Sequence, residues 1–151
     1  MSSSRFDRYV VLAQRFGTRT LLFQQAAARQ LDLTATELGC FRLVQLDGPI
    51  IASDLAKETG LTPASLSVII DKLVARNFLS REQDKKDRRR WLLRAIEIAI
   101  VRVDVVYTAH AHRVEALLDE YTSEEFETAL RFIDKLSTEL KATAIDLGCG
   151  D

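Results

Sequence analysis

Apolar residues recur at three- and four-residue steps near both ends of the chain, which is the spacing of one helix face. One such stretch covers residues 6–30, and a second, unusually apolar one covers residues 96–120. Thr122 and Glu125 then form a capping pattern for a last helix that carries apolar residues as far as Leu147. Helices this long usually bury their stripes against a second copy, so we expect an obligate homodimer. The alternative is a monomeric bundle in which these helices pack only on one another.

The central part of the chain predicts shorter elements. The segment Thr34-Ala-Thr-Glu37 is a capping box for a helix that stops at Gly48-Pro49. A short helix over residues 53–59 ends at Gly60. Thr62-Pro63 opens another helix, with threonine as the N-cap and proline in the first turn, where its missing N–H is not needed. Two short helices joined by a tight turn that contains glycine form a helix-turn-helix.

A hairpin follows the helix-turn-helix. Asn77 ends the second helix because asparagine tolerates the left-handed conformation of a C-terminal cap. Residues 78–81 and 91–94 then read as two strands around a polar loop over residues 82–90. The predicted fold class is therefore mainly α with a small β-hairpin wing, a winged helix-turn-helix with long helical dimerisation arms. The predicted regions are a winged helix-turn-helix over residues 34–95, a dimerisation region over residues 1–33 and 96–147, and a tail over residues 148–151.

The charge of the chain is concentrated in one short stretch. The formal net charge is −1, which gives no support to a uniformly basic nucleic-acid coat. Residues 71–94 nevertheless contain nine Lys/Arg against four Asp/Glu, a net charge of +5, so the rest of the chain carries −6. Most of this positive charge lies in the run Lys85-Lys86-Asp87-Arg88-Arg89-Arg90, at the tip of the predicted hairpin. Such local asymmetry is typical of a DNA-binding surface.

Three segments together carry a family resemblance: Ser53 to Ser67, Ile69 to Arg81, and the Asp84-Lys-Lys-Asp-Arg-Arg89 run. They resemble the MarR (multiple antibiotic resistance regulator) family of dimeric winged-helix transcription factors. The resemblance implies that Arg89, two residues after an aspartate, enters a minor groove while Asp87 braces it. One departure is Val68, which stands where many members have an arginine on the recognition helix.

The second short helix is expected to lie in the major groove. Ser65 and Ser67 suit hydrogen bonds to base edges or phosphates, and Ala64 and Val68 suit contacts with thymine methyl groups. The remaining basic side chains, including Lys72, suit phosphate contacts that make binding depend on salt. The predicted DNA-binding residues are Thr62, Ala64, Ser65, Ser67, Val68, Lys72, Lys85, Lys86, Asp87, Arg88, Arg89 and Arg90.

These features predict a homodimeric, sequence-specific transcriptional regulator that binds a pseudo-palindromic operator in double-stranded DNA. A repressor is favoured over an activator because occupying a promoter needs no additional contact surface. The resemblance adds a small-molecule effector, frequently an aromatic acid in this family. The alternative is a winged-helix protein-interaction or architectural module without operator specificity, which the apolar Val68 keeps open. An enzyme is not predicted, because the chain has no nucleophile motif, no Gly-rich phosphate loop and no convincing carboxylate pair.

A few residues suggest other chemistry without defining a site. Arg15, His110 and His112 are candidates for contact with an anionic effector. The two histidines are two residues apart and so do not share a helix face, which argues against a metal site. Cys40 is more consistent with an inert core residue than with a redox sensor, and Cys149 lies in the tail. We therefore predict no cofactor, no metal, no membrane partner and a soluble cytoplasmic protein.

Overall fold

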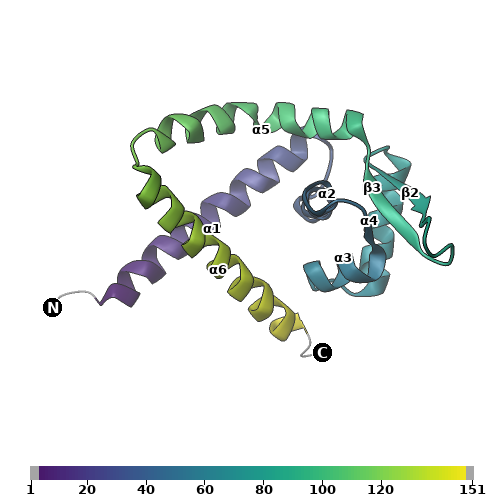
Figure 1. Cartoon of the computed structure of the whole chain (residues 1–151), viewed down its shortest axis with the longest axis horizontal. Helices are drawn as coiled ribbons and strands as arrows, with labels where there is room; N and C mark the ends of the chain where they lie inside the picture. Colours follow the sequence, from purple (N-terminus) through teal and green to yellow (C-terminus); the bar gives the residue numbers. More distant parts are fainter. Residues whose placement is uncertain (1–3, 149–151) are drawn as a thin grey trace. The chain divides into compact units, whose positions relative to one another are not determined.

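The computed structural model describes residues 4–148 and is mainly helical, with one small sheet (Figure 1). The fold class predicted from the sequence, a winged helix-turn-helix, is confirmed. The chain divides into two compact units, Met1–Gly39 and Cys40–Asp151. In chain order the elements are α1 (Arg5–Gln30), α2 (Ala35–Asp47), β1 (Ile50–Ile51), α3 (Ala52–Thr59), α4 (Pro63–Ala75), β2 (Leu79–Gln83), β3 (Trp91–Ala95), α5 (Glu97–Leu118) and α6 (Ser123–Gly148).

The first unit consists of α1 and the start of α2. A capping box opens α1, in which the N–H of Asp7 donates to Ser4 Oγ at 3.0 Å and the N–H of Ser4 donates to Asp7 Oδ2 at 2.8 Å. The bonds that the Asp7 carboxylate accepts from Ser4, above all the one from the backbone N–H, lower the pKa of this carboxyl. The predicted capping box of α2 is also present, because Thr34 and Glu37 exchange bonds of 2.9 and 3.1 Å. Both helix starts are therefore specified by local sequence.

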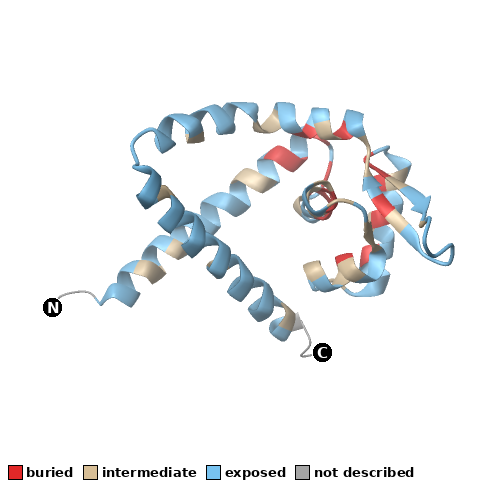
Figure 2. Cartoon of the chain, viewed as in Figure 1, coloured by how far each residue is buried: buried red, intermediate tan, exposed pale blue. Residues whose placement is uncertain are grey.

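The second unit contains the main core, where α3, α4, the sheet and the start of α5 bury their apolar residues (Figure 2). At its centre the rings of Phe41 and Phe78 meet edge to face, with their centroids 5.5 Å apart and their planes at 82°. The other fully buried side chains of this unit include Val44, Leu55, Leu66, Ile70, Leu73, Leu79 and Val103. The core therefore fixes α4 against the sheet from which the wing extends.

The end of α4 delivers Phe78 to this core. Asn77 has a φ of 58°, in the left-handed region, as predicted. Its N–H donates to the carbonyl of Val74 at 3.0 Å, and the N–H of Phe78 donates to the carbonyl of Leu73 at 2.8 Å. These two bonds form a Schellman motif, with Leu73 and Phe78 as its hydrophobic pair.

The sheet has three antiparallel strands in the order β1-β3-β2. The sequence predicted only the hairpin of β2 and β3, because the two residues of β1 are too few to show a strand period. Strand β2 also runs two residues further than predicted, since Glu82 and Gln83 pair with Leu92 and Trp91. The wing loop is correspondingly shorter than expected and covers residues 84–90.

The two long helices of the second unit follow the sheet. Ile96 is the single residue between β3 and α5, and it caps the helix without a side-chain bond. The turn before α6 has the predicted cap: Glu125 Oε2 accepts the N–H of Thr122 at 2.9 Å and its hydroxyl at 2.8 Å. These bonds lower the pKa of the Glu125 carboxyl. Over residues 4–148, no helix has the length and apolarity needed to cross a membrane.

The α6 cap predicts a pH dependence. Because the pKa of Glu125 is lowered in the folded chain, its contribution to stability is present above the ordinary pKa of 4.5 and is lost as the pH falls through the folded value. We expect Thr122→Ala to raise the Glu125 pKa towards its ordinary value, measured from the chemical shift of the carboxyl carbon. Thr138→Ala is the matched control, because Thr138 lies on the same helix and donates to the carbonyl of Asp134 instead. Equal midpoints in the two variants would contradict the assignment.

Candidate nucleic-acid interface

The turn between α3 and α4 contains the predicted helix-ending glycine and the predicted N-cap threonine. Gly60 has a φ of 68° and ends α3, where a left-handed residue is required. Thr62 caps α4: its Oγ1 accepts the N–H of Ser65 at 3.2 Å, and its hydroxyl donates to Ser65 Oγ at 2.9 Å. The hydroxyl proton of Ser65 is therefore directed away from this bond and is available to an acceptor outside the chain.

Helix α4 has one buried face and one exposed face. Leu66, Ile70 and Leu73 are buried on the inner side. The outer side carries Ser67 and Val68, and the Val68 side chain is 56% exposed. All twelve predicted DNA-binding residues are exposed, on α4 and its cap or on the wing loop. The outer face of α4 thus presents short hydroxyl and methyl groups, which suit the edges of bases.

The wing loop is ordered by two aspartates. Asp84 Oδ1 accepts the N–H of Lys86 at 2.8 Å, and Asp87 Oδ1 accepts the N–H of Arg89 at 3.0 Å. The N–H of Arg90 donates to the carbonyl of Asp87 at 2.9 Å, which closes a turn around the tip. Asp87 therefore contacts Arg89 through the backbone of the arginine, and this bond holds the chain while the guanidinium points into solvent.

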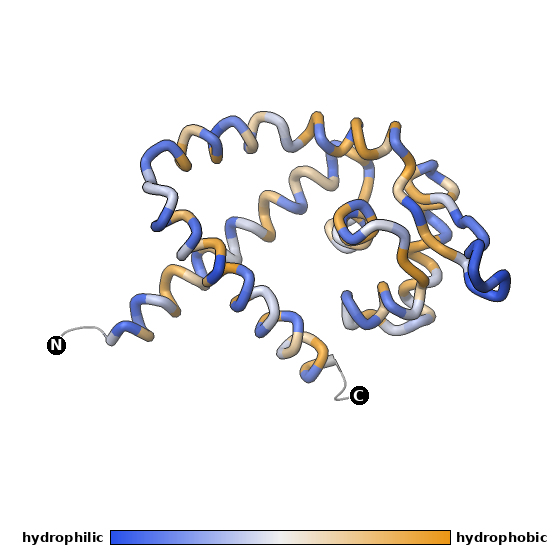
Figure 3. Tube along the Cα trace, viewed as in Figure 1, coloured by the Kyte–Doolittle hydropathy of each residue, from blue (hydrophilic) through white to orange (hydrophobic). Residues whose placement is uncertain are grey.

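The ion pairs of the wing lie at its base. Arg81 pairs with Asp71 of α4 at 2.6 Å, and Arg94 pairs with Glu82 across the strands at 3.0 Å. Within residues 4–148, no ion pair takes up the basic side chains of the tip, and Figure 3 shows this tip as a continuous hydrophilic segment. These side chains are Lys85, Lys86, Arg88, Arg89 and Arg90. The positive charge of the central stretch is therefore concentrated at the tip.

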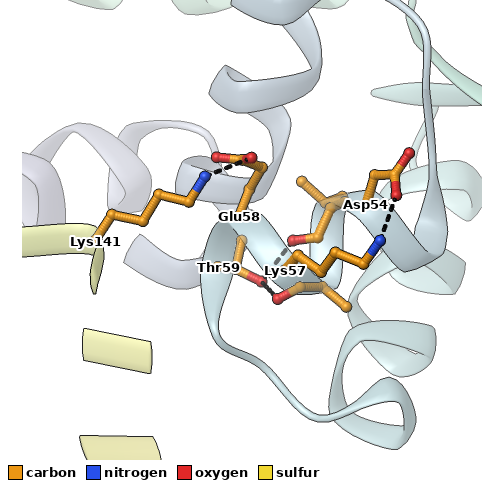
Figure 4. Close-up of polar contacts among 7 residues, drawn as sticks. Asp54, Lys57, Glu58, Thr59 and Lys141 are labelled. Carbon is orange, nitrogen blue, oxygen red and sulfur yellow. Dashed lines mark hydrogen bonds and ion pairs between the residues drawn. The ribbon is translucent and has the colours of Figure 1, made fainter. Parts of the chain in front are cut away.

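Helix α3 also forms an ion pair with the last helix, α6. Lys141 of α6 lies 2.6 Å from Glu58 of α3, and Lys57 lies 3.1 Å from Asp54 within the helix (Figure 4). The sequence did not indicate the first of these pairs, because its partners are 83 residues apart. The contact connects the helix-turn-helix to α6.

The other candidate residues lie on three different helices. Cys40 is 1% exposed, so its burial matches that of a core residue. Arg15 lies on α1, and His110 and His112 lie on exposed turns of α5. In the described part of the chain, no three His, Cys, Asp or Glu residues are grouped closely enough to hold a metal ion. Cys149 and the tail beyond Gly148 lie outside the described residues.

One exposed residue of this surface was missed by the sequence reasoning. Trp91, at the start of β3, is 55% exposed and lines a cavity of about 280 Å³ between α3, α4 and the sheet. The only signal in the sequence is an aromatic residue directly after the basic run, at the start of a predicted strand.

This arrangement agrees with comparisons to known proteins. The family model described as MarR family matches residues 33–91. The uncharacterised HTH-type transcriptional regulator YcgE of Bacillus subtilis is 34% identical over 135 residues, which are 89% of this chain and 88% of YcgE. The chain belongs to the MarR family. It is accordingly a transcriptional regulator, not an enzyme.

Solved structures share the MarR-family fold. A MepR-like protein crystallised with pseudoligands is 26% identical, with a TM-score of 0.55, over 93% of this chain and 99% of that protein. FabT of Streptococcus pneumoniae, solved in complex with DNA, has a TM-score of 0.71 at 17% identity, over 91% of this chain and 99% of FabT. The likeness to FabT is one of fold.

The Asp87 bond predicts how the wing tip responds to substitution. In Asp87→Ala the N–H of Arg89 loses its acceptor, so its amide exchange should become faster by roughly tenfold at most, the value of one exposed hydrogen bond. Asp87→Asn keeps a side-chain oxygen at the same position and should exchange like the parent. Amide exchange followed by NMR measures both. Equal exchange in Asp87→Ala and the parent would show that the bond does not order the tip.

Proposed function

We propose that this MarR-family regulator is a homodimer that binds a pseudo-palindromic operator in double-stranded DNA and acts as a repressor. The observation that carries the proposal is the concentration of unpaired cations at the wing tip of the unit whose helix α4 has an exposed polar face. Residues 34–95 would form the DNA-binding region, and residues 1–33 and 96–147 the dimerisation region. Repression requires only that the bound dimer occupy the promoter.

In this proposal α4 enters the major groove. Ser65 and Ser67 donate to base edges or phosphates, and Ala64 and Val68 contact thymine methyl groups. Thr62 contributes by holding the first turn of the helix through its bonds to Ser65. Lys72, exposed on the same helix, contacts a phosphate.

The wing supplies the second contact. Arg89 enters the minor groove, where a narrow A·T-rich segment concentrates negative potential. Asp87 fixes the backbone from which this side chain projects. The phosphate contacts of the wing come from Lys85, Lys86, Arg88 and Arg90. The fold that this chain shares with FabT, which was solved in complex with DNA, supports this docking.

The homodimer is supported by apolar side chains that the single chain leaves exposed. On α6 the exposed residues Leu130, Ile133, Leu140 and Leu147 recur at steps of three and seven, so they share one helix face. Exposed apolar residues also occur on α5 and on α1, including Val101, Val105, Leu12 and Phe16. Contiguous apolar faces of this length mark an interface between chains.

Release by a small-molecule effector is the last part of the proposal, and its support is the space available. A cavity of about 470 Å³ joins the end of α2, the base of the wing and the start of α5, and Arg94 lies in its lining. An anionic occupant would compete with Glu82 for this arginine and so act on the wing. A screen of aromatic acids for an increase in the melting temperature of the protein tests this part of the proposal. If no compound stabilises the protein, the effector proposal is wrong.

Selection from a random duplex library tests the function. We expect enrichment of a pseudo-palindrome whose half-sites lie about one helical turn apart. Uniform, salt-sensitive retention of all sequences would instead favour the architectural module. Absence of retention would overturn DNA binding altogether.

The enriched duplex then tests the wing. We expect Arg89→Ala to weaken its binding by roughly tenfold to a hundredfold and to lower the preference over a scrambled duplex. Arg88→Ala is the matched comparison, because a phosphate contact should weaken binding to both duplexes equally and reduce the salt slope by roughly one. Fluorescence anisotropy of labelled DNA measures both variants. Unchanged affinity of Arg89→Ala at physiological salt would refute the assignment of the wing.

The dimer is tested on α6. Ile133→Glu with Leu140→Glu removes four apolar side chains from a two-fold interface, which should weaken association by at least about a thousandfold. Sedimentation equilibrium should then show a monomer with retained helical circular dichroism. Lys135→Glu is the control, because it changes charge on the same helix away from this face and should stay dimeric. A parent chain that sediments as a monomer would contradict the proposal.

A further inference from the structure

Trp91 has an unusual position for the only tryptophan of the chain. It pairs with Gln83 at the end of the hairpin nearest the wing tip and directly follows Arg90. Leu93, two residues further along β3, faces the same side of the sheet and is buried. Trp91 therefore extends the core-facing row of the strand beyond the core, and 55% of its surface is exposed.

The cavity beside Trp91 lies between α4 and the wing hairpin, the two elements that are proposed to bind DNA. Its lining includes Pro63 and Ser67 from the first two turns of α4, together with Trp91 and Arg81 from the hairpin. The lining is mainly apolar, and the guanidinium of Arg81 is engaged by Asp71 at 2.6 Å. The cavity thus has a mainly apolar lining that includes two residues with hydrogen-bond donors, Ser67 and Trp91.

The geometry of a duplex indicates what would face this cavity. A recognition helix in a major groove and a wing in the adjacent minor groove lie on opposite sides of one sugar–phosphate strand. The surface between the helix and the wing must therefore face that strand. In this chain Ser67 of α4 and Trp91, at the end of β3 that adjoins the wing loop, line one cavity between these elements.

We propose that Trp91 is a DNA-backbone contact residue that packs on a deoxyribose of the strand between the two grooves. Its ring covers the apolar carbon atoms of the sugar, and its Nε1–H donates to a neighbouring phosphate oxygen. The proposal rests on the proposed function, because it requires α4 and the wing to occupy adjacent grooves. It adds a contact that strengthens binding without reading bases.

This role differs measurably from those of the wing cations. A neutral side chain displaces no counterion, so its removal should weaken binding without changing the salt slope. A contact with the sugar and phosphate carries no sequence information, so selected and scrambled duplexes should lose affinity equally. Arg88→Ala changes the salt slope, and Arg89→Ala changes the preference between duplexes. Loss of Trp91 should change neither.

The experiment uses the full chain and the duplex enriched by selection. The emission of Trp91, which has no other tryptophan to obscure it, should change on addition of DNA with the same midpoint as the anisotropy of the labelled duplex. We expect Trp91→Ala to bind both duplexes roughly tenfold more weakly at an unchanged salt slope, and Trp91→Phe to fall between this variant and the parent. Leu46→Ala, which removes another exposed apolar side chain of the same unit, should bind like the parent.

The outcomes separate the two proposals. Unchanged emission while the duplex binds, with parental affinity in Trp91→Ala, overturns the contact and leaves the proposed function intact. Full affinity in Trp91→Phe, combined with a lower melting temperature and weaker binding in Trp91→Ala, also overturns it, because Trp91 then acts only as packing. Absence of DNA binding by the parent chain defeats the proposed function and with it this contact.

Discussion

The backbone of Asn77 must turn through the left-handed region for Phe78 to reach the core. From there the ring of Phe78 meets Phe41 of α2, and the guanidinium of Arg102 on α5 lies 4.9 Å from its centroid. The carbonyl of Phe78 also accepts the N–H of Ile96, where β3 passes into α5. One buried residue thus joins α2, α4, the sheet and the long helix. The spacing between α4 and the wing depends on this packing.

The hairpin of β2 and β3, which begins after Phe78, also separates the charges. Its paired strands place Arg81 beside Asp71 and Arg94 beside Glu82, so the basic residues nearest the core are neutralised where the wing joins it. The loop beyond the strands has acidic residues too, but Asp84 and Asp87 accept backbone N–H groups there. A chain with a net charge of −1 can therefore present a locally positive surface to a polyanion.

The features of the fold that could be predicted from the sequence are those that depend on neighbouring residues. Gly60, Thr62 and Asn77 act within a few residues of themselves, and the sequence placed each of them correctly. Contacts across the chain leave no such pattern, as the pair between Glu58 and Lys141 demonstrates. In the candidate site, the basic residues could be found by counting charges. The exposure of Trp91 could not be predicted, because it depends on where β3 enters the core.

The junction at Ile96 has a mechanical consequence. A single residue separates β3 from a helix of 22 residues, which is about 33 Å long. Because no linker lies at this point, and because Arg102 and Asp104 hold the first turns of α5 against the core, β3 and the start of α5 are rigidly coupled. A rotation of β3 by a few degrees about this junction would therefore turn α5 through the same angle and displace its other end, Leu118, by ångströms. Conversely, a displacement of the distal end of α5 would rotate the hairpin of β2 and β3.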